Sequence, residues 1–188
     1  MTEPAVSSLL QLPIPPDARE AWAALFAQPL DDGKVRDQAA LVFRLGVEWL
    51  ALPAALFVGA ADPSPAHRLP HRHAPGLRGI VNVRGQLYPC IALGVLLGIA
   101  DSEALPASGS ARGFPRQLLV TLGPQTYAFS VEEVLGLQRY AGGDLQAAPS
   151  TVAGQLQPFL SAVLAIDGRQ VGLLATDRLE RVMRETLL

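Results

Sequence analysis

Three histidines lie in one seven-residue segment, at His67, His71 and His73, and neutral imidazole is a common metal ligand. A metal site needs ligands that converge on one point, as on one face of a helix, but Pro70 interrupts this segment. The only carboxylate nearby is that of Asp62. The spacing therefore favours a structural or solvated role for the histidines over metal ligation, and we expect no metal and no cofactor.

Other reactive side chains are equally poor candidates for catalysis. The single cysteine, Cys90, lies in an apolar run, where a free thiol more often behaves as a small buried hydrophobe than as a nucleophile. The chain contains no Gly-x-Ser-x-Gly turn, no phosphate-binding loop and no dinucleotide fingerprint. We therefore expect no catalytic residue. One cysteine also excludes an internal disulfide, which suits the cytoplasm.

The composition of the chain limits the remaining classes of function. Of the 188 residues 49% are hydrophobic, and 15 Lys and Arg against 17 Asp and Glu give a net charge of -2. The longest uncharged stretches, 49–61 and 87–100, each contain proline and fall short of the roughly 20 residues of a spanning helix, so we expect no membrane insertion. A nucleic-acid-binding β-barrel is the competing class, disfavoured by 6% aromatics and by carboxylates that offset the arginines.

A binding role directs attention to the segment Asn82-Val83-Arg84-Gly85. An arginine at the end of an apolar strand, immediately before a turn glycine, holds its planar fork of donors at a rigid position. The simpler alternative is a surface arginine that caps its own turn. We favour a partner contact over this alternative.

The elements that must position this segment are hairpins. From residue 41 onward, short apolar runs alternate with glycine, which is typical of antiparallel strands. The predicted hairpins are 41–45 with 48–52, 80–84 with 86–91, 117–122 with 126–130, and 162–166 with 170–175. A further apolar strand should follow the first hairpin of each half, and helices should cover 92–97 and 176–184.

An internal repeat relates these hairpins. Residues 41–46 align with 118–123 at an offset of 77, and 79–83 align with 161–165. After one extra residue, Gly85 aligns with Gly168. Each half then holds about five strands and one helix, enough for a small β-barrel. We expect a mainly β fold of two subdomains, about 41–100 and 116–188, joined by a linker at 101–115.

The first 40 residues differ in pattern from the rest. Asp17 followed by Glu20 resembles the start of a capped helix, predicted here over 17–27. Its apolar stripe consists of Trp22, Leu25 and Phe26. Such a stripe more often docks on its own domain than on a partner, and both alternatives stay open.

Taken in order, several segments resemble the CheW-like domain, the scaffold family of bacterial chemosensory arrays. The matching segments are 43–53, 79–89, 96–98, 131–136, 158–160 and 167–168. The resemblance runs from about residue 41 to 182. It implies two SH3-like five-stranded β-barrels without catalytic activity, which couple a methyl-accepting chemoreceptor to the regulatory domain of a CheA-like histidine kinase. It also implies a cytoplasmic location at membrane receptor arrays.

The same resemblance implies a partner-binding site in the groove between the subdomains. The residues expected there are Phe57, Val58, Asn82, Val83, Arg84 and Gly85. Apolar surface elsewhere would pair with the homologous barrel domain of the kinase.

Two departures from the family pattern suggest a divergent paralogue. The family usually carries Glu-Val or Glu-Ile where this chain has Gly59-Ala60, and Val-Asp-Leu where it has Ile91-Ala92-Leu93. The segment 67–72, His-Arg-Leu-Pro-His-Arg, followed by 79–85 and Cys90, is similar to accessory CheW-like proteins of Wsp-type surface-sensing pathways, whose output is a diguanylate cyclase.

Overall fold

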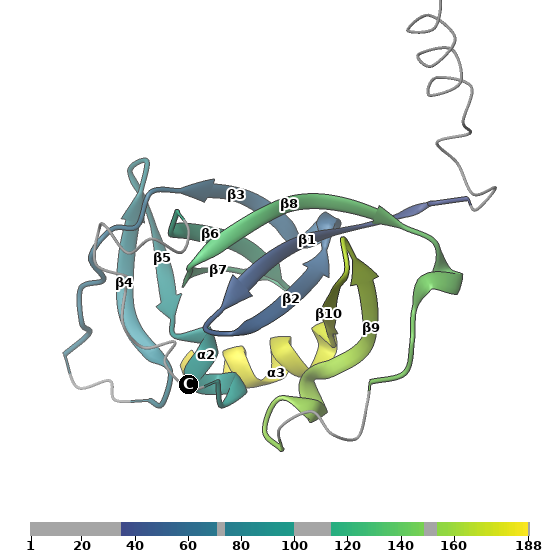
Figure 1. The fold of residues 1–188 in the computed structure, drawn as a ribbon. Coiled ribbons are helices and arrows are strands. Elements are labelled where there is room, and N and C mark those ends of the chain that lie inside the picture. Colours follow the sequence, from purple (N-terminus) through teal and green to yellow (C-terminus); the bar gives the residue numbers. More distant parts are fainter. Residues whose placement is uncertain (1–34, 71–73, 100–113, 149–153, 188) are drawn as a thin grey trace, which may run out of the picture. The chain divides into compact units, whose positions relative to one another are not determined.

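Ten strands form two five-stranded sheets in the computed structural model, which describes residues 35–70, 74–99, 114–148 and 154–187 (Figure 1). Sheet A has the strand order β8 (Glu133–Tyr140), β1 (Gln38–Leu45), β2 (Glu48–Pro53), β10 (Arg169–Leu174), β9 (Leu160–Ile166). Sheet B has the order β3 (Phe57–Ala61), β6 (Arg116–Leu122), β7 (Gln125–Val131), β5 (Gln86–Ile91), β4 (Leu77–Val83). The helices are α2 (Leu93–Leu97) and α3 (Thr176–Leu187), with 3-10 turns η2 (Ala54–Leu56), η3 (Gly142–Asp144) and η4 (Gln157–Phe159).

These elements confirm the predicted mainly β fold. All four predicted hairpins form, the two additional strands are β3 and β8, and both helices start within one residue of their expected positions. The predicted helix at 17–27, His71 and His73, and nearly all of the predicted linker lie outside the described residues.

The composition of the sheets differs from the expectation that each half of the sequence curls into its own barrel. Sheet A combines β1 and β2 with β8, β9 and β10, whereas sheet B combines β6 and β7 with β3, β4 and β5. The two repeats have thus exchanged their first hairpins. Each exchanged hairpin is joined to the strands of the other repeat by a parallel pair. Leu173 of β10 lies opposite Ala51 of β2, and Cys90 of β5 lies opposite Ala128 of β7.

The repeat itself extends through both sheets, with one correction to its alignment. In the second hairpins, Val83 lies opposite Gln86 and Ile166 lies opposite Arg169, so equivalent residues are 83 apart. The predicted offset of 82 for the strand was wrong by one residue. Because side chains alternate between the two faces of a strand, an alignment that is wrong by one residue would match the exposed Asn82 with a buried position of β9.

Three apolar clusters hold the sheets together. A central cluster takes residues from both sheets and both helices, and its aromatic pair Phe43 and Phe129 have ring centroids 5.8 Å apart. Two further clusters lie on the faces of sheet A and sheet B that are turned away from the central cluster. Strand β1 contributes Phe43 to the central cluster and Val42 to the sheet A cluster, so it is buried on both faces. Burial on both faces is why so large a share of the sequence is apolar.

The connection after each edge strand bonds to the opposite edge of the same sheet. The chain that leaves β3 pairs at His67 with Ile80 of β4, and the chain that leaves β8 pairs at Gln146 with Val163 of β9. Gly79 permits this approach, because a Cβ there would lie 2.0 Å from the carbonyl oxygen of His67. The edges of both sheets are therefore partly covered by the chain's own backbone.

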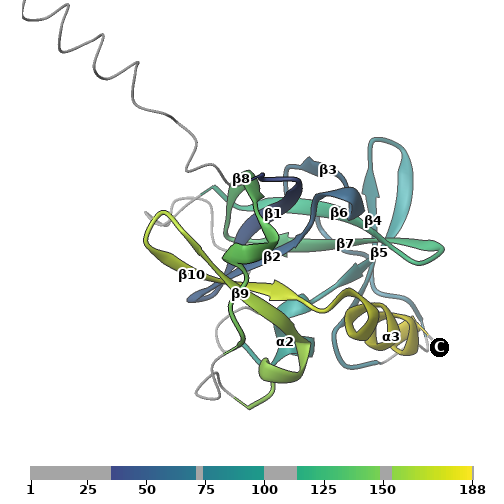
Figure 2. The same ribbon diagram turned by 90° about the vertical axis from the view of Figure 1, so that its right-hand side faces the viewer.

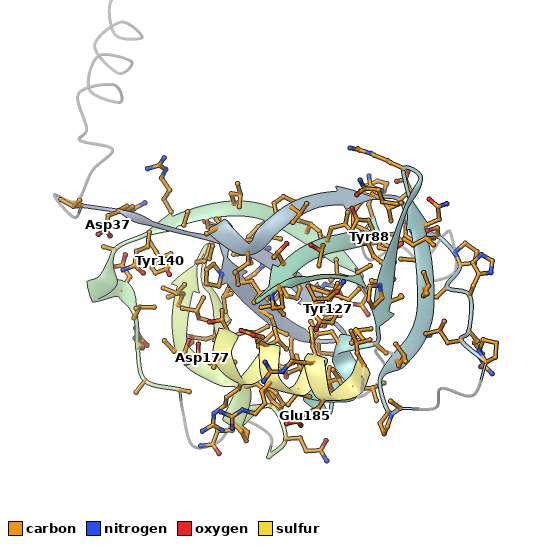
Figure 3. All side chains as sticks on the ribbon, turned by 180° about the vertical axis from the view of Figure 1, so that it is seen from behind. Asp37, Tyr88, Tyr127, Tyr140, Asp177 and Glu185 are labelled. Atoms are coloured by element: carbon orange, nitrogen blue, oxygen red, sulfur yellow. The ribbon has the colours of Figure 1, made fainter. Side chains whose placement is uncertain are left out.

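The helix α3 contributes Leu179 and Met183 to the central cluster. It lies below β7 in both ribbon views (Figures 1 and 2). Tyr127 lies near the middle of the view, with Tyr140 on the sheet A side and Tyr88 on the sheet B side (Figure 3).

Candidate protein-binding site

The turn between β4 and β5 presents Arg84 on a rigid backbone. Arg84 and Gly85 have φ angles of 53° and 86°, the left-handed conformation that a two-residue hairpin turn requires. The Asn82 side chain fastens this turn, since its Oδ1 accepts a hydrogen bond from the Gly85 N–H at 2.8 Å. Arg84 is exposed, so its guanidinium is held out in solvent. A non-glycine residue in this conformation costs about 1 kcal/mol or more, which the surrounding hairpin must offset.

The remaining predicted site residues divide into buried and exposed positions. Val83 is buried in the sheet B cluster, so its side chain supports the hairpin and does not face solvent. Phe57 packs partly buried against the central cluster. Val58 is 56% exposed, at a bulge in β3 that opens between Phe57 and Gly59.

The structure brings only some of these residues together. Asn82 and Gly85 are joined directly, whereas Phe57 and Val58 lie on β3, the opposite edge strand of sheet B. A partial link runs through Ser64, whose Oγ lies 3.5 Å from the backbone oxygen of Asn82.

Sequence reasoning missed Leu87, which is 66% exposed and lies directly opposite Asn82. Cross-strand partners share one face of a sheet, so Leu87 and Asn82 form one outward surface beside Arg84. The signal was available in the sequence. A two-residue turn at Arg84-Gly85 fixes the register and pairs residue 82 with residue 87.

A buried hydrogen-bond cluster underlies this surface. Gln117 is fully buried, and its Nε2 donates to Cys90 Sγ at 3.7 Å. Gln117 Oε1 accepts the Ser64 N–H at 3.3 Å and lies 3.2 Å from Ser64 Oγ. Gln117 thereby ties the chain after β3 to strands β5 and β6.

Cys90 has the environment of a structural thiol. Burial raises the pKa of Cys90 above its ordinary value, and the positive charge of Arg78 opposes this with a smaller effect. The thiol is therefore protonated at neutral pH and shielded from reagents. This confirms the prediction that Cys90 is buried.

The described residues contain no group of three or more His, Cys, Asp or Glu that could hold a metal ion. His67 takes part through its backbone, which exchanges hydrogen bonds of 2.8 and 2.9 Å with Ile80. The prediction that the three histidines bind no metal stays a prediction, since two of them lie outside the described residues. Within the part of the chain that the structure covers, no helix is long and apolar enough to cross a membrane.

Arg44 and two glutamates help to join the two sheets. Arg44 of β1 donates from Nε to Glu133 at 3.1 Å and from Nη1 to the backbone oxygen of Gly46 at 2.8 Å. Glu132 accepts the Gly46 N–H at 3.0 Å. These bonds fix the β1–β2 turn to the point where the chain passes from sheet B to sheet A.

Comparison with known proteins agrees with this fold. A family model described as "CheW-like domain" matches residues 39–182. The crystal structure of the scaffolding protein TtCheW from Thermoanaerobacter tengcongensis superposes with a TM-score of 0.59 at 18% sequence identity, covering 73% of this chain and 84% of that one. At this sequence identity, the structural similarity shows that the two proteins share a fold. No match was found among curated proteins. Because the family model covers most of the sequence, the chain belongs to the CheW-like domain family, whose members are scaffold proteins and not enzymes.

Proposed function

We propose that this protein is an adaptor that couples a methyl-accepting chemoreceptor to the regulatory domain of a CheA-like histidine kinase. The observation that carries the proposal is the CheW-like match over residues 39–182, on a fold of two joined sheets. The adaptor works in the cytoplasm, at an array of membrane receptors.

The receptor contacts are Arg84 and its turn, together with Phe57 and Val58. A guanidinium on a fixed turn loses little conformational entropy when it pairs with a carboxylate, because the backbone is already ordered. The exposed Val58 adds an apolar contact at the other edge of sheet B.

The kinase contact lies elsewhere, on sheet A. Strand β8 is an edge strand of that sheet and carries Leu137, which is 58% exposed. An edge strand with an exposed apolar side chain suits pairing with another β-barrel domain. Both contacts are small and weak alone, and repetition in an array supplies the strength.

Capture of a receptor signalling domain on immobilised adaptor tests the proposal. Arg84→Glu should reduce capture at least about tenfold, the effect of losing one charge-assisted contact of about 1.4 kcal/mol. Arg181→Glu on α3 is the matched control, because it makes the same charge change at an exposed arginine far along the chain. Equal capture by wild type and Arg84→Glu would remove Arg84 from the site, and no capture by wild type would refute the receptor role.

The pathway output follows from the resemblance of residues 67–72 to accessory proteins of Wsp-type systems. We propose that the array controls a diguanylate cyclase. Deletion of this protein should then change cellular cyclic-di-GMP on surface contact while swimming chemotaxis persists. Loss of chemotaxis with unchanged cyclic-di-GMP would contradict this assignment.

A further inference from the structure

The side chain of Trp49 is contacted by two arginines, one from each neighbouring strand. Strand β2, which carries Trp49, lies between β1 and β10 in sheet A. The Cζ atom of Arg44 on β1 is 6.0 Å from the centroid of the Trp49 ring, and that of Arg169 on β10 is 5.1 Å from it. Both distances are in the range of a cation–π interaction, so the ring holds each guanidinium in a defined place.

The two arginines differ in their other contacts. Arg44 is half-buried, and its guanidinium donates to the carboxylate of Glu133 and to the backbone oxygen of Gly46. Arg169 is exposed, and among the residues that the structure describes no carboxylate pairs with it. A planar guanidinium that lies over a ring keeps the N–H donors at its edge free. Arg169 therefore has both its charge and its donors available for a partner.

The internal repeat shows what the fold itself requires at these positions. At the offset of 77, Arg44 and Trp49 correspond to Thr121 and Thr126, and both pairs lie directly opposite each other in their hairpins. The two threonine hydroxyls are 2.8 Å apart and form a hydrogen bond. Sheet B thus has a small neutral pair where sheet A has an arginine and an aromatic ring.

The second hairpins differ in the same sense. At the offset of 83, Arg169 corresponds to Gln86, which accepts a hydrogen bond from the hydroxyl of Tyr88 on its own strand. Sheet B therefore satisfies this position with a neutral side chain bonded to its neighbour. Since the same fold forms with Thr126 and Gln86, it does not require Trp49 and Arg169.

Apolar side chains lie beside Arg169. Ile166 is its direct partner across the β9–β10 hairpin and is half-buried against the sheet A cluster, as Trp49 is. Val47, in the turn between β1 and β2, is 85% exposed. Strands β2 and β10 pair in parallel, and their register, carried back to the turn, brings residue 47 level with residue 169. Val47, Trp49, Ile166 and Arg169 are called the Trp49 surface below.

The Trp49 surface is separate from both contacts proposed above. The receptor contacts are on β3 and at the β4–β5 turn of sheet B, and the kinase contact is on the edge strand β8. The β9–β10 turn, which precedes Arg169, lies well away from the β4–β5 turn in both ribbon views (Figures 1 and 2). A partner on the Trp49 surface therefore leaves the β4–β5 turn free.

The chemistry of this surface selects among ligands. A nucleobase or a quaternary ammonium needs an uncovered ring face, but arginines from both neighbouring strands lie over Trp49. A phosphate dianion is matched best by more than one free cation, whereas Glu133 already neutralises Arg44. One free guanidinium beside apolar side chains instead matches a carboxylate that has a bulky apolar neighbour.

We propose that the Trp49 surface binds a short peptide segment of a partner protein, in which Asp or Glu stands next to Leu, Ile or Phe. Arg169 forms a bidentate pair with the carboxylate, and the apolar side chain packs on Val47 and Ile166. The inference goes beyond the proposed adaptor function, because it concerns a contact separate from those of the receptor and the kinase.

Random ten-residue peptides, displayed on phage with their C-terminal ends fused to the coat protein, test the proposal on the immobilised full chain. Because that end is fused, a carboxylate that binds belongs to a side chain. Wild type should enrich peptides with Asp or Glu next to Leu, Ile or Phe. Arg169→Gln, which introduces the residue that sheet B has, should lower this enrichment about tenfold.

Arg181→Gln, at an exposed position of α3, is the matched control and should enrich the same peptides as wild type. Absence of the acidic and apolar class from the wild-type selection, or its equal enrichment by wild type and Arg169→Gln, would overturn the inference.

One enriched peptide, made with an amidated C-terminus, is then titrated into the full chain labelled with ¹⁵N. It should shift the indole N–H signal of Trp49 and the amide signals of Ile166 and Arg169. Exchange of its acidic residue for the amide should weaken binding about tenfold. Arg169→Lys should weaken it severalfold, because an ammonium keeps the charge but not the planar fork. Signal shifts centred on the β4–β5 turn, or equal binding of the acidic and amide peptides, would contradict the proposal.

Discussion

Sheets A and B place different side chains at equivalent interior positions. Residue 40 in β1 and residue 117 in β6 are related by the repeat, and both are fully buried, yet one is Ala40 and the other is Gln117. Leu173 and Cys90 are likewise equivalent, because each faces the equivalent alanine across a parallel pair. Sheet A therefore has an apolar interior, while sheet B contains a hydrogen-bonded amide and thiol.

This difference shows which features the duplicated fold needs. Turn glycines and the alternation of buried residues are kept in both repeats, since they determine strand register. Interior chemistry has diverged. In sheet B the amide of Gln117 binds the chain after β3, so the sheet that bears the β4–β5 hairpin also holds its long connection by hydrogen bonds.

The largest effect should come from separating the repeats. Cutting the chain in the linker to give residues 1–107 and 108–188 leaves each fragment without two or three strands of each sheet. Neither fragment should give a dispersed ¹H–¹⁵N spectrum alone, and mixing them should restore it. A folded, monomeric single fragment would contradict the exchange of hairpins.

The next largest effect should come from removing an aromatic ring from the central cluster. Phe43→Ala should lower the free energy of unfolding by about 3–5 kcal/mol, because it leaves a cavity beside Phe129. Since this cluster serves both sheets, hydrogen exchange should speed up in both. Faster exchange confined to sheet A would contradict the shared core. Chemical denaturation of this variant gives the magnitude.

Gln117→Ala tests the polar interior of sheet B, because it introduces alanine, the residue that sheet A has at the equivalent position. It should cost about 1–3 kcal/mol, because the Ser64 N–H loses its acceptor. The control Gln170→Ala, at an exposed position, should stay within about 0.5 kcal/mol. Equal effects of the two variants on urea denaturation would show that the buried amide adds nothing.

Cys90 should make stability depend on alkaline pH. Its pKa is raised in the folded state, so the folded protein holds the proton more tightly than the unfolded chain does. Stability is therefore complete below pH 9, the ordinary thiol value, and falls as pH rises above it, by at most about 1.4 kcal/mol per pH unit.

Cys90→Ala should flatten this slope between pH 9 and 10 in denaturation experiments. The window matters because Tyr127 and Tyr140, whose pKa values burial also raises, contribute only above pH 10. An unchanged slope in Cys90→Ala would show that the thiol is not the source.

The smallest effects on stability belong to the two turns. Arg84→Asn and Asp167→Asn each place Asn-Gly, a favoured pair for this turn, and should change stability by less than about 0.5 kcal/mol. Melting temperatures check this. Only Arg84→Asn should weaken receptor capture, so a loss of capture in both variants would break the distinction between the hairpins.

Local sequence signals predicted the local structure well. Gly46, Gly85 and Asp167-Gly168 marked the hairpins, because a two-residue turn demands residues that accept positive φ. The exchange of hairpins was beyond such signals, since a strand that is buried on both faces has the same pattern in either sheet. Its partner is decided by packing between segments more than 70 residues apart.

The candidate site was predicted in part for the same reason. Arg84 was recognised from the turn residues beside it. Val83 was included although it faces the interior, and Leu87 was omitted although it faces solvent. Both outcomes depend on which face of β4 packs against sheet B, and alternation alone does not say which face that is.

The adaptor role is tested most directly by asking whether one molecule holds both partners. Sedimentation of the protein with a receptor signalling domain and a kinase regulatory domain should reveal a ternary complex. The double variant Arg84→Asp with Leu87→Gln, which gives β4–β5 the turn residues of β9–β10 and the glutamine of its outward face, should lose the receptor and retain the kinase. Mutually exclusive binding of the two partners, or an intact ternary complex with the double variant, would contradict the account.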